Sequence, residues 1–144
     1  MCSSDLQERF AAETFGQGDI TMCPLTMASV AATVANGTFK QPILLPGQSQ
    51  AAATPLPAGV DKDLKTLMRG VITEGTATSL RGISPTLGAK TGTAERQNED
   101  PDSWMIAMDP QHDIAVACVV LNGGFGDTKA GPAIKAMLTG IGIG

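Results

Sequence analysis

At 144 residues the chain has the length of one ordinary domain, and its 42% hydrophobic and 17% charged residues are typical of a globular protein. The net charge of −4 and the lack of a Lys/Arg cluster argue against nucleic acid as a partner. The longest apolar run, residues 114–121, is far shorter than the ~20 residues that span a bilayer, and no signal-peptide pattern opens the sequence. We therefore expect no membrane anchor in this chain.

Residues 1–6 are interpreted as foreign to the remainder. Their Cys-Ser-Ser-Asp-Leu segment is what one reading frame of a common sequencing-adapter end encodes. The alternative is an ordinary polar terminus that frays. On the first interpretation the domain occupies residues 7–144.

The cysteines and the single histidine, His112, do not form a metal-binding pattern, because no two cysteines stand in a CxxC pair. We expect no metal and no cofactor. Cys2 is left out of any disulfide argument. Cys23 and Cys118 are predicted to stay unpaired, because Cys118 lies in the middle of a predicted strand and buried free cysteine is common.

Two helices are predicted in the first half of the chain. Apolar residues recur at helical spacing over residues 24–36, with Pro24 suited to the first turn, and this helix should be largely buried. Residues 41–59 have neither helical nor strand periodicity and are predicted as a surface connection or irregular edge segment. An amphipathic helix follows, with Asp61 as its N-cap and Gly75 as its stop.

Three extended segments, residues 87–94, 103–108 and 114–121, are predicted to form an antiparallel meander. The acidic stretch at 95–102 lacks the spacing of a calcium loop and is predicted as a solvated hairpin loop. A last helix over residues 129–138 should cover the sheet.

The first of these strands carries Lys90, Thr91, Gly92 and Thr93. A lysine followed by alternating hydroxyls can present a cation and hydrogen-bond donors to a carboxylate. Gly92 lets a ligand backbone approach closely. A Lys-Thr-Gly triplet occurs by chance in roughly 3% of chains this long, and an edge-strand lysine that discourages aggregation is the alternative interpretation. The flanking sequence has to decide between them.

The flanking segments have a specific order: Phe-Gly-Gln-Gly at 15–18, Pro-Leu-Thr-Met-Ala at 24–28, Ala-Asn-Gly at 35–37, Gly-Thr-Ala at 75–77 and Ala-Lys-Thr-Gly-Thr-Ala-Glu at 89–95. In order and spacing they resemble the later half of the class B penicillin-binding protein transpeptidase domain. Ser103-Trp104-Met105-Ile106 resembles the family's next strand, so the resemblance extends from about residue 7 onward. Local departures are Cys23 where a threonine is usual, Thr26 where glutamine is frequent, and Ser103 where a histidine is frequent.

The resemblance implies an α/β fold of the serine beta-lactamase/transpeptidase type, an antiparallel sheet flanked by helices with the Lys90 strand at an edge. In that family a Ser-x-x-Lys helix supplies the acylating serine, and a Ser-x-Asn loop assists proton transfer. Neither pattern occurs in this sequence. We therefore expect the C-terminal portion of an incomplete domain, inactive alone, whose 114–121 strand and 24–36 helix lack neighbours and which dissolves poorly.

The implied activity is serine acyl transfer on the D-Ala-D-Ala end of a peptidoglycan stem peptide, with beta-lactams acylating the same serine. Carried over, Lys90 attracts the terminal carboxylate, the Thr91 and Thr93 hydroxyls hydrogen-bond it, Gly92 keeps the strand open, and the Thr93 N–H is an oxyanion donor. The parent protein is expected to be membrane-anchored at the extracytoplasmic face of the bacterial membrane, with cell-wall synthesis proteins as partners.

Other interpretations stay open. Within the same fold, the parent could be a beta-lactam hydrolase or a penicillin-sensing domain; outside it, a stand-alone protein could hold peptide termini without catalysis. Three further residues are given structural roles: Gln17 in an ordinary glycine turn, Trp104 as a packed aromatic, and His112 as a solvated turn residue.

Overall fold

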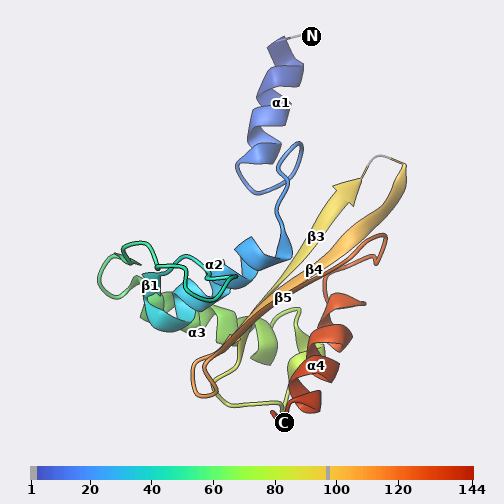
Figure 1. Cartoon of the computed structure of the whole chain (residues 1–144). Helices are drawn as coiled ribbons and strands as arrows, with labels where there is room; N and C mark the ends of the chain where they lie inside the picture. The colour runs from blue at the N-terminus through green and yellow to red at the C-terminus, as the bar shows by residue number, and fades with distance from the viewer. Residues whose placement is uncertain (1–2, 97) are drawn as a thin grey trace.

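The computed structural model describes residues 3–96 and 98–144. A three-stranded sheet stands at its centre, with helices on both faces and an N-terminal helix that projects away from the sheet (Figure 1). The elements are α1 Ser3–Glu13, α2 Pro24–Asn36, β1 Thr38–Phe39, β2 Thr54–Pro55, α3 Val60–Thr73, the 3-10 turn η1 Thr78–Leu80, β3 Gly88–Arg96, β4 Glu99–Asp109, β5 Ile114–Val120 and α4 Ala130–Gly140.

The central sheet is the predicted antiparallel meander, in the order β3-β4-β5. Lys90 pairs with Ile106 across the first ladder, and Met105 pairs with Cys118 across the second. Within the described residues β3 and β5 are both edge strands, so the prediction of the Lys90 strand at an edge is confirmed.

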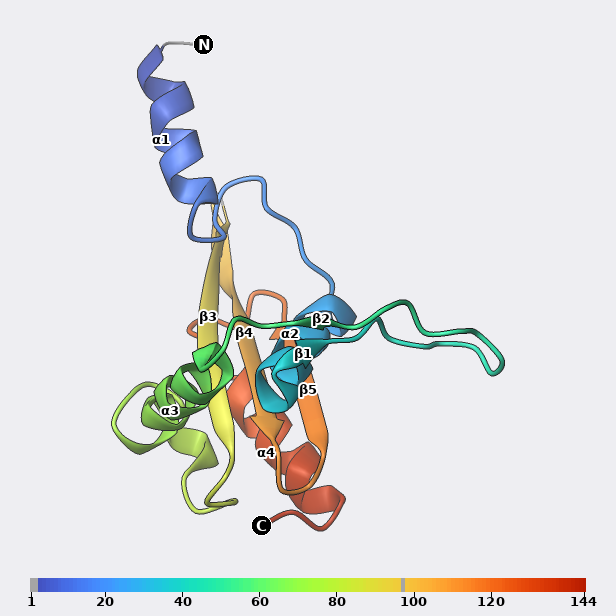
Figure 2. The same cartoon turned by 90° about the vertical axis from the view of Figure 1, so that its left-hand side faces the viewer.

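Two hydrophobic cores lie on opposite faces of this sheet, because side chains alternate between the faces of a strand. One core joins the sheet to α4 through Ile134 and Leu138, and the other joins it to α2 through Ala31 and Val34. Helix α3 lies beside the β3 edge and contributes to both. Figure 2 shows α2 in front of the strands and α4 behind them.

Helix α2 has the predicted bounds and local signals, with Pro24 in its first turn and Gly37 at its C-cap with φ 69°. Its packing differs from expectation in two ways. It lies against β4 and β5, so the expectation that it lacks neighbours is wrong. It is also not largely buried, because Leu25 and Val30 remain exposed on its outer face. β5 pairs with β4 on one side, and among the described residues no strand pairs with its other side.

Helix α3 begins two residues earlier than predicted, and Asp61 is not its N-cap. Gly59, with φ 85°, occupies the cap position, and Asp61 lies in the first turn, 3.1 Å from Lys65 Nζ. A carboxylate there still interacts favourably with the helix dipole. Asp61 therefore correctly indicated where the helix starts to within two residues, but its predicted role as the N-cap was wrong.

The stretch at 95–102 forms the exposed end of a hairpin, as predicted, but among the described residues most of it is strand and not loop. β3 continues to Arg96, and β4 begins at Glu99, so the Asp-Pro-Asp stretch at 100–102 is strand; Gln97 lies outside the described residues. Arg96 Nη1 lies 3.2 Å from a Glu99 oxygen and 3.5 Å from an Asp102 oxygen. These cross-strand charge pairs favour a longer hairpin over an acidic loop.

The irregular stretch predicted over 41–59 forms a protruding arm whose base is the short β1–β2 pair (Figure 2). At the N-terminus α1 begins at Ser3, inside the hexapeptide interpreted as foreign, whose first two residues lie outside the described part. Among the described helices, none is long and apolar enough to cross a membrane.

Candidate active-site strand

Lys90, Thr91, Gly92 and Thr93 lie consecutively in β3, on the side of the sheet that has no neighbouring strand in the described residues. The Lys90 side chain is exposed, and its Nζ donates to the Thr91 carbonyl oxygen at 2.7 Å. The three residues after it are half-buried. The structure therefore places all four predicted site residues together, and the ammonium group lies along the strand edge, on the backbone of the next residue.

The Gln17 side chain contacts the same edge of β3, two residues beyond the Thr91 carbonyl. Its Nε2 donates to the Thr93 carbonyl at 2.9 Å, and the Glu95 N–H donates to its Oε1 at 3.2 Å. In an antiparallel pair a residue directs its N–H and C=O to the same side. The Thr93 N–H therefore also points to the free edge, between the Thr91 carbonyl bound by Lys90 and the Thr93 carbonyl bound by Gln17.

Gln17 is a site residue that sequence reasoning missed. The prediction of a glycine turn is correct, since Gly16 and Gly18 have φ of 83° and 70°. What the turn does is present the glutamine amide to a strand 76 residues away. The only local signal was a long polar side chain between two glycines, and it gives no information about a distant partner.

Both threonine side chains lie on the α4 face and are held by neighbouring segments. Thr91 Oγ1 lies 2.6 Å from Thr76 Oγ1, and Thr93 Oγ1 accepts a hydrogen bond from the Gly126 N–H at 3.3 Å. Because Thr93 Oγ1 serves as an acceptor there, its own proton remains available to a further acceptor such as a carboxylate.

Other segments of this chain lie close to the Gly92 backbone. A Cβ at Gly126 would lie 2.6 Å from the Gly92 carbonyl oxygen, and a Cβ at Gly92 would lie 3.1 Å from Trp104 Cβ. The absence of side chains thus lets the segment before α4 press on one face of β3, and lets the tryptophan pack against the other.

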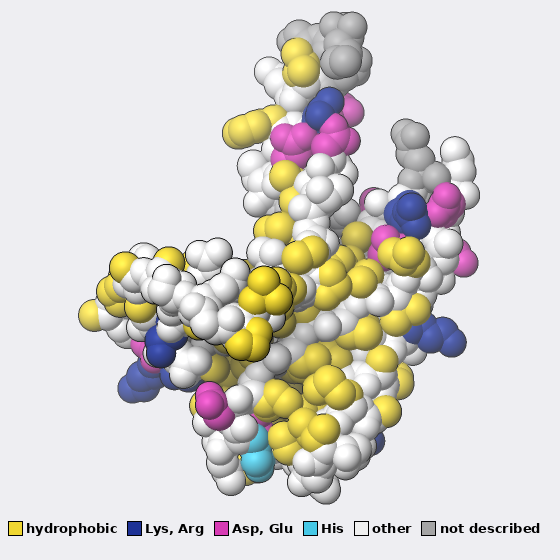
Figure 3. All heavy atoms as spheres, in the orientation of Figure 1, with side chains coloured by type: hydrophobic (Ala, Val, Ile, Leu, Met, Phe, Trp, Pro, Cys, Tyr) yellow, Lys and Arg dark blue, Asp and Glu magenta, His cyan; other side chains and the backbone are white. Residues whose placement is uncertain are grey.

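A cavity of about 590 Å³ opens beside this strand. Lys90 is the one charged residue among those that line it, and Trp104 is part of its wall, so the prediction of Trp104 as only a packed aromatic is incomplete. The hydrophobic lining consists chiefly of Phe15, Ile20, Met22, Met27, Trp104 and Ile106. Hydrophobic side chains gather on this face below α1 (Figure 3). A single cation beside an apolar wall suits a ligand with one anionic group and an apolar body.

The segment that touches Thr93 is fixed by a buried serine. Ser103 Oγ lies 2.9 Å from the Phe125 carbonyl and 3.0 Å from the Gly126 carbonyl, and it accepts from the Ala130 N–H at 3.1 Å. This is the position at which the resembled family often has a histidine. Here a small hydroxyl joins β4 to the start of α4, with its side chain fully buried.

Asp127 fixes the other side of the same segment. Its carboxylate accepts from the Ser79 hydroxyl at 2.5 Å, the Ser79 N–H at 3.2 Å and the Thr78 hydroxyl at 3.1 Å. Gly131 leaves the necessary space, because a Cβ there would lie 2.3 Å from Asp127 Oδ1. The turn η1, which follows Thr76, is thereby tied to α4.

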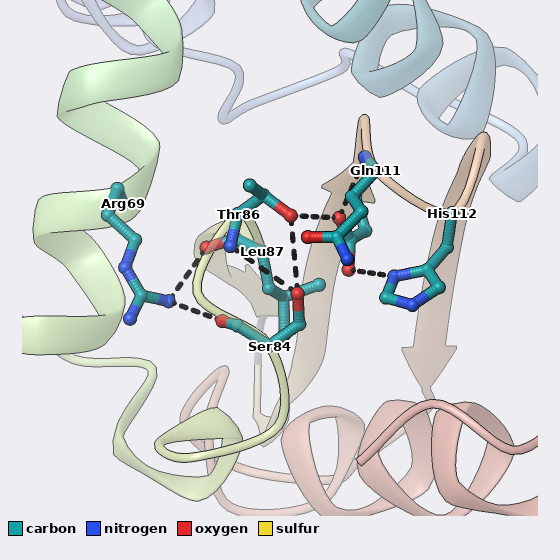
Figure 4. A network of polar contacts seen from close by, with 7 residues as sticks. Arg69, Ser84, Thr86, Leu87, Gln111 and His112 are labelled. Carbon is teal, nitrogen blue, oxygen red and sulfur yellow. Dashed lines mark hydrogen bonds and ion pairs between the residues drawn. The ribbon is translucent and has the colours of Figure 1, made fainter.

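A second polar cluster surrounds Asp109, the last residue of β4 (Figure 4). The buried carboxylate accepts from Thr86 Oγ1 at 2.5 Å and the Gln111 N–H at 3.1 Å, and lies 2.8 Å from His112 Nδ1. Burial raises the pKa of Asp109, but the surrounding hydrogen bonds outweigh it and leave the pKa below its usual value. His112 is exposed in a turn, as predicted, and it is in addition a partner of Asp109, which the sequence did not indicate.

Cys23 and Cys118 are both free thiols, as predicted. Cys23 is the N-cap of α2, and its sulfur accepts from the Thr26 N–H at 3.4 Å. The hydrogen bond with the Thr26 side chain lowers the pKa of Cys23, while burial raises the pKa of Cys118. In residues 3–96 and 98–144 no three His, Cys, Asp or Glu side chains gather as metal ligands would.

Comparisons with known proteins identify a family for this chain. The family model described as penicillin binding protein transpeptidase domain matches residues 4–139. The chain is 32% identical over 145 residues to the peptidoglycan D,D-transpeptidase PbpA of Mycolicibacterium smegmatis, a match that covers 85% of this chain and 29% of that protein.

Solved structures agree. Penicillin-binding protein A from M. tuberculosis, as its penicillin G acyl-enzyme complex, has a TM-score of 0.69 at 28% identity, covering 90% of this chain and 34% of that one. PBP2 from Helicobacter pylori has a TM-score of 0.71 at 28% identity, covering 90% and 26%. The chain thus spans about a third or less of the length of the relatives it matches.

The predicted fold class, an antiparallel sheet with helices on both faces as in the transpeptidases, is confirmed by these structures. The match to the family model includes nearly all of α1 and α4 and the described helices and strands between them, with the Lys90 strand inside it. The chain therefore belongs to the penicillin-binding protein transpeptidase domain family.

Proposed function

We propose that this chain is part of a peptidoglycan D,D-transpeptidase, in which it supplies the strand that holds the D-Ala-D-Ala end of a stem peptide during serine acyl transfer. The observation that carries the proposal is the free edge of β3, where the Lys90 ammonium lies beside the inferred position of the Thr93 N–H. The name of the M. smegmatis relative and the penicillin G and imipenem acyl-enzymes of the M. tuberculosis protein support it.

Carboxylate binding is assigned to Lys90 and to the hydroxyls of Thr91 and Thr93. The Lys90 ammonium is exposed and bound only to a carbonyl among the described residues, so it can turn to an anion that arrives at the edge. The Thr93 hydroxyl, whose oxygen accepts from Gly126, keeps its proton for the same carboxylate. The Thr91 hydroxyl, which lies 2.6 Å from Thr76 Oγ1, is assigned to the same carboxylate.

Oxyanion stabilisation is assigned to the Thr93 N–H. In the acyl-transfer mechanism of this family the second donor belongs to the nucleophilic serine, and the Ser-x-x-Lys and Ser-x-Asn patterns are absent from this sequence. Loss of one oxyanion donor costs about 100- to 1000-fold in rate, and loss of the nucleophile removes acylation altogether. We propose that the isolated chain is inactive and forms the C-terminal portion of the domain.

The site of action follows from the substrate. Peptidoglycan stem peptides lie outside the cytoplasmic membrane, so the intact enzyme is proposed to act at the extracytoplasmic face, anchored to the membrane and associated with other cell-wall synthesis proteins. A beta-lactam hydrolase of the same fold would differ in one property, because its acyl-enzyme would turn over quickly.

The test compares this chain with the longer protein encoded by the uninterrupted gene. Fluorescent penicillin should label the longer protein covalently and stably, and should leave this chain unlabelled. Lys90→Met in the longer protein should slow labelling about 10- to 100-fold, because a hydrogen bond to a charged group is lost, whereas Lys129→Met at the exposed start of α4 should not.

Covalent labelling of this chain would overturn the assigned mechanism. A longer protein that binds no penicillin, or whose label is lost within seconds by hydrolysis, would overturn the assignment as a transpeptidase.

A further inference from the structure

Part of the edge of β3 that has no neighbouring strand in the described residues is already hydrogen-bonded by a side chain. A strand edge normally offers a row of unpaired N–H and C=O groups, to which an extended peptide can add as a further strand. Here the Gln17 side chain already pairs with two of these groups, the Thr93 C=O and the Glu95 N–H. Its amide carries one acceptor and two donors on one rigid plane, so it replaces one peptide unit of a neighbouring strand.

We propose that Gln17 is a positioning residue that ends the peptide-docking edge of β3 at Thr93 and so fixes the register of the substrate. The inference rests on the proposed function, because it concerns the same edge. A docked chain can place a carbonyl on the Thr93 N–H, while the next donor along the edge, the Glu95 N–H, is held by Gln17 Oε1.

The competing register explains why such a stop is useful. A slip of one residue would turn every side chain of the peptide to the other face, so the nearest equivalent register differs by two residues, about 6.8 Å along the strand. In that slipped register the peptide carbonyl would lie on the Glu95 N–H. The carboxylate of the peptide would then lie about two residues, or about 6.8 Å, further from the Lys90 ammonium. Such a complex binds without reacting.

The local structure holds Gln17 in place for this role. The glycines on either side adopt left-handed backbone angles that other residues rarely take, φ 83° at Gly16 and 70° at Gly18. The Gln17 N–H donates to the Ala12 carbonyl at 3.0 Å, which ties the turn to the end of α1. The backbone and the side chain of Gln17 are thus both fixed, and the amide needs little ordering to meet β3.

The first experiment measures amide hydrogen exchange by NMR in this full chain. The Glu95 N–H should be protected, although it lies on a free strand edge, and Gln17→Ala should speed its exchange about tenfold. The Thr93 N–H should exchange quickly in both proteins. The matched control is Gln50→Ala, which removes a similar amide-to-carbonyl bond, Nε2 to Gln41 O at 3.2 Å, in the protruding arm.

The second experiment measures steady-state kinetics of the longer protein on a D-Ala-D-Ala peptide. Slipped binding withdraws enzyme from the reactive complex, so Gln17→Ala should lower kcat and KM by the same factor, about 3- to 10-fold, and leave kcat/KM unchanged. Gln17→Glu keeps the acceptor for Glu95 but lacks the donor for Thr93, so its effect should be intermediate. Gln50→Ala should change neither constant.

A fall in kcat/KM with KM unchanged would show that Gln17 only supports the fold, and unchanged kinetics would show that no slipped complex forms; either result overturns the proposal. Unprotected Glu95 in the unsubstituted chain would also overturn it. These outcomes are separate from a failure of the proposed function, which would appear as an absence of penicillin labelling in the longer protein that carries Gln17 unchanged.

Discussion

Replacing Ser103 by alanine removes the hydroxyl that joins β4 to the segment before α4. The group is fully buried, donates one proton shared between the Phe125 and Gly126 carbonyls, and accepts from the Ala130 N–H. Loss of the donated bond costs about 0.5–1.5 kcal/mol, and a buried N–H without an acceptor costs about 1–3 kcal/mol. We expect Ser103→Ala to lower the free energy of unfolding by about 2–4 kcal/mol.

The assay is urea unfolding followed by the fluorescence of Trp104, the single tryptophan, which neighbours the substituted position in β4. The control is Ser49→Ala in the exposed arm, which should change stability by less than about 0.5 kcal/mol. If Ser103→Ala and Ser49→Ala unfold at the same urea concentration, the Ser103 hydroxyl does not hold the segment before α4, and the argument for its role is refuted.

Three further predictions concern the two thiols, the buried Asp109 and Gly126. Iodoacetamide should modify Cys23 at lower pH than Cys118, because a threonine hydrogen bond lowers the pKa of the first thiol and burial raises that of the second; peptide mass spectrometry between about pH 7 and 9 checks this. The pKa of Asp109 is lowered in the folded protein, because its hydrogen bonds outweigh burial. The ionised carboxylate therefore stabilises the fold above its unfolded pKa of about 4, and this stabilisation is lost as the pH falls. Asp109→Asn should therefore be less stable at pH 7 and should show a flatter loss of stability between about pH 4 and 2 in urea titrations; an unchanged slope would contradict the assignment. Gly126→Ala should destabilise the protein by about 1–3 kcal/mol in the same titrations, because the added Cβ would lie 2.6 Å from a carbonyl oxygen of β3, and a variant as stable as the parent would show that the segment shifts freely.

Local signals were sufficient where the physical cause is local. Pro24 and the glycine at the C-cap gave the bounds of α2, because proline fits a helical first turn and glycine adopts the left-handed angle that ends a helix. The three strands of the meander were predicted as extended segments between turn signals, although the first two are longer than predicted. The strand character of residues 99–102 depends on charge pairs with Arg96, which exist only once the hairpin has formed.

Environment was harder to predict than element type. The apolar residues of α2 indicated a buried helix, yet the side that carries Leu25 and Val30 faces away from the sheet and stays exposed. His112 stands in a turn, as expected, but its partner is a carboxylate buried at the end of β4. Exposure and hydrogen bonding depend on which elements pack together, and a residue pattern specifies this only in part.

For the site, the sequence alone determined the chemical groups and their spacing along one strand. Lys90, Thr91, Gly92 and Thr93 follow one another, so any extended conformation presents them in a row with alternating sides. The tertiary structure decided which edge groups are free. Gln17 reaches β3 across 76 residues, and Gly126 reaches Thr93 across 33. Contacts at such separations depend on how the whole chain packs, which no local pattern encodes.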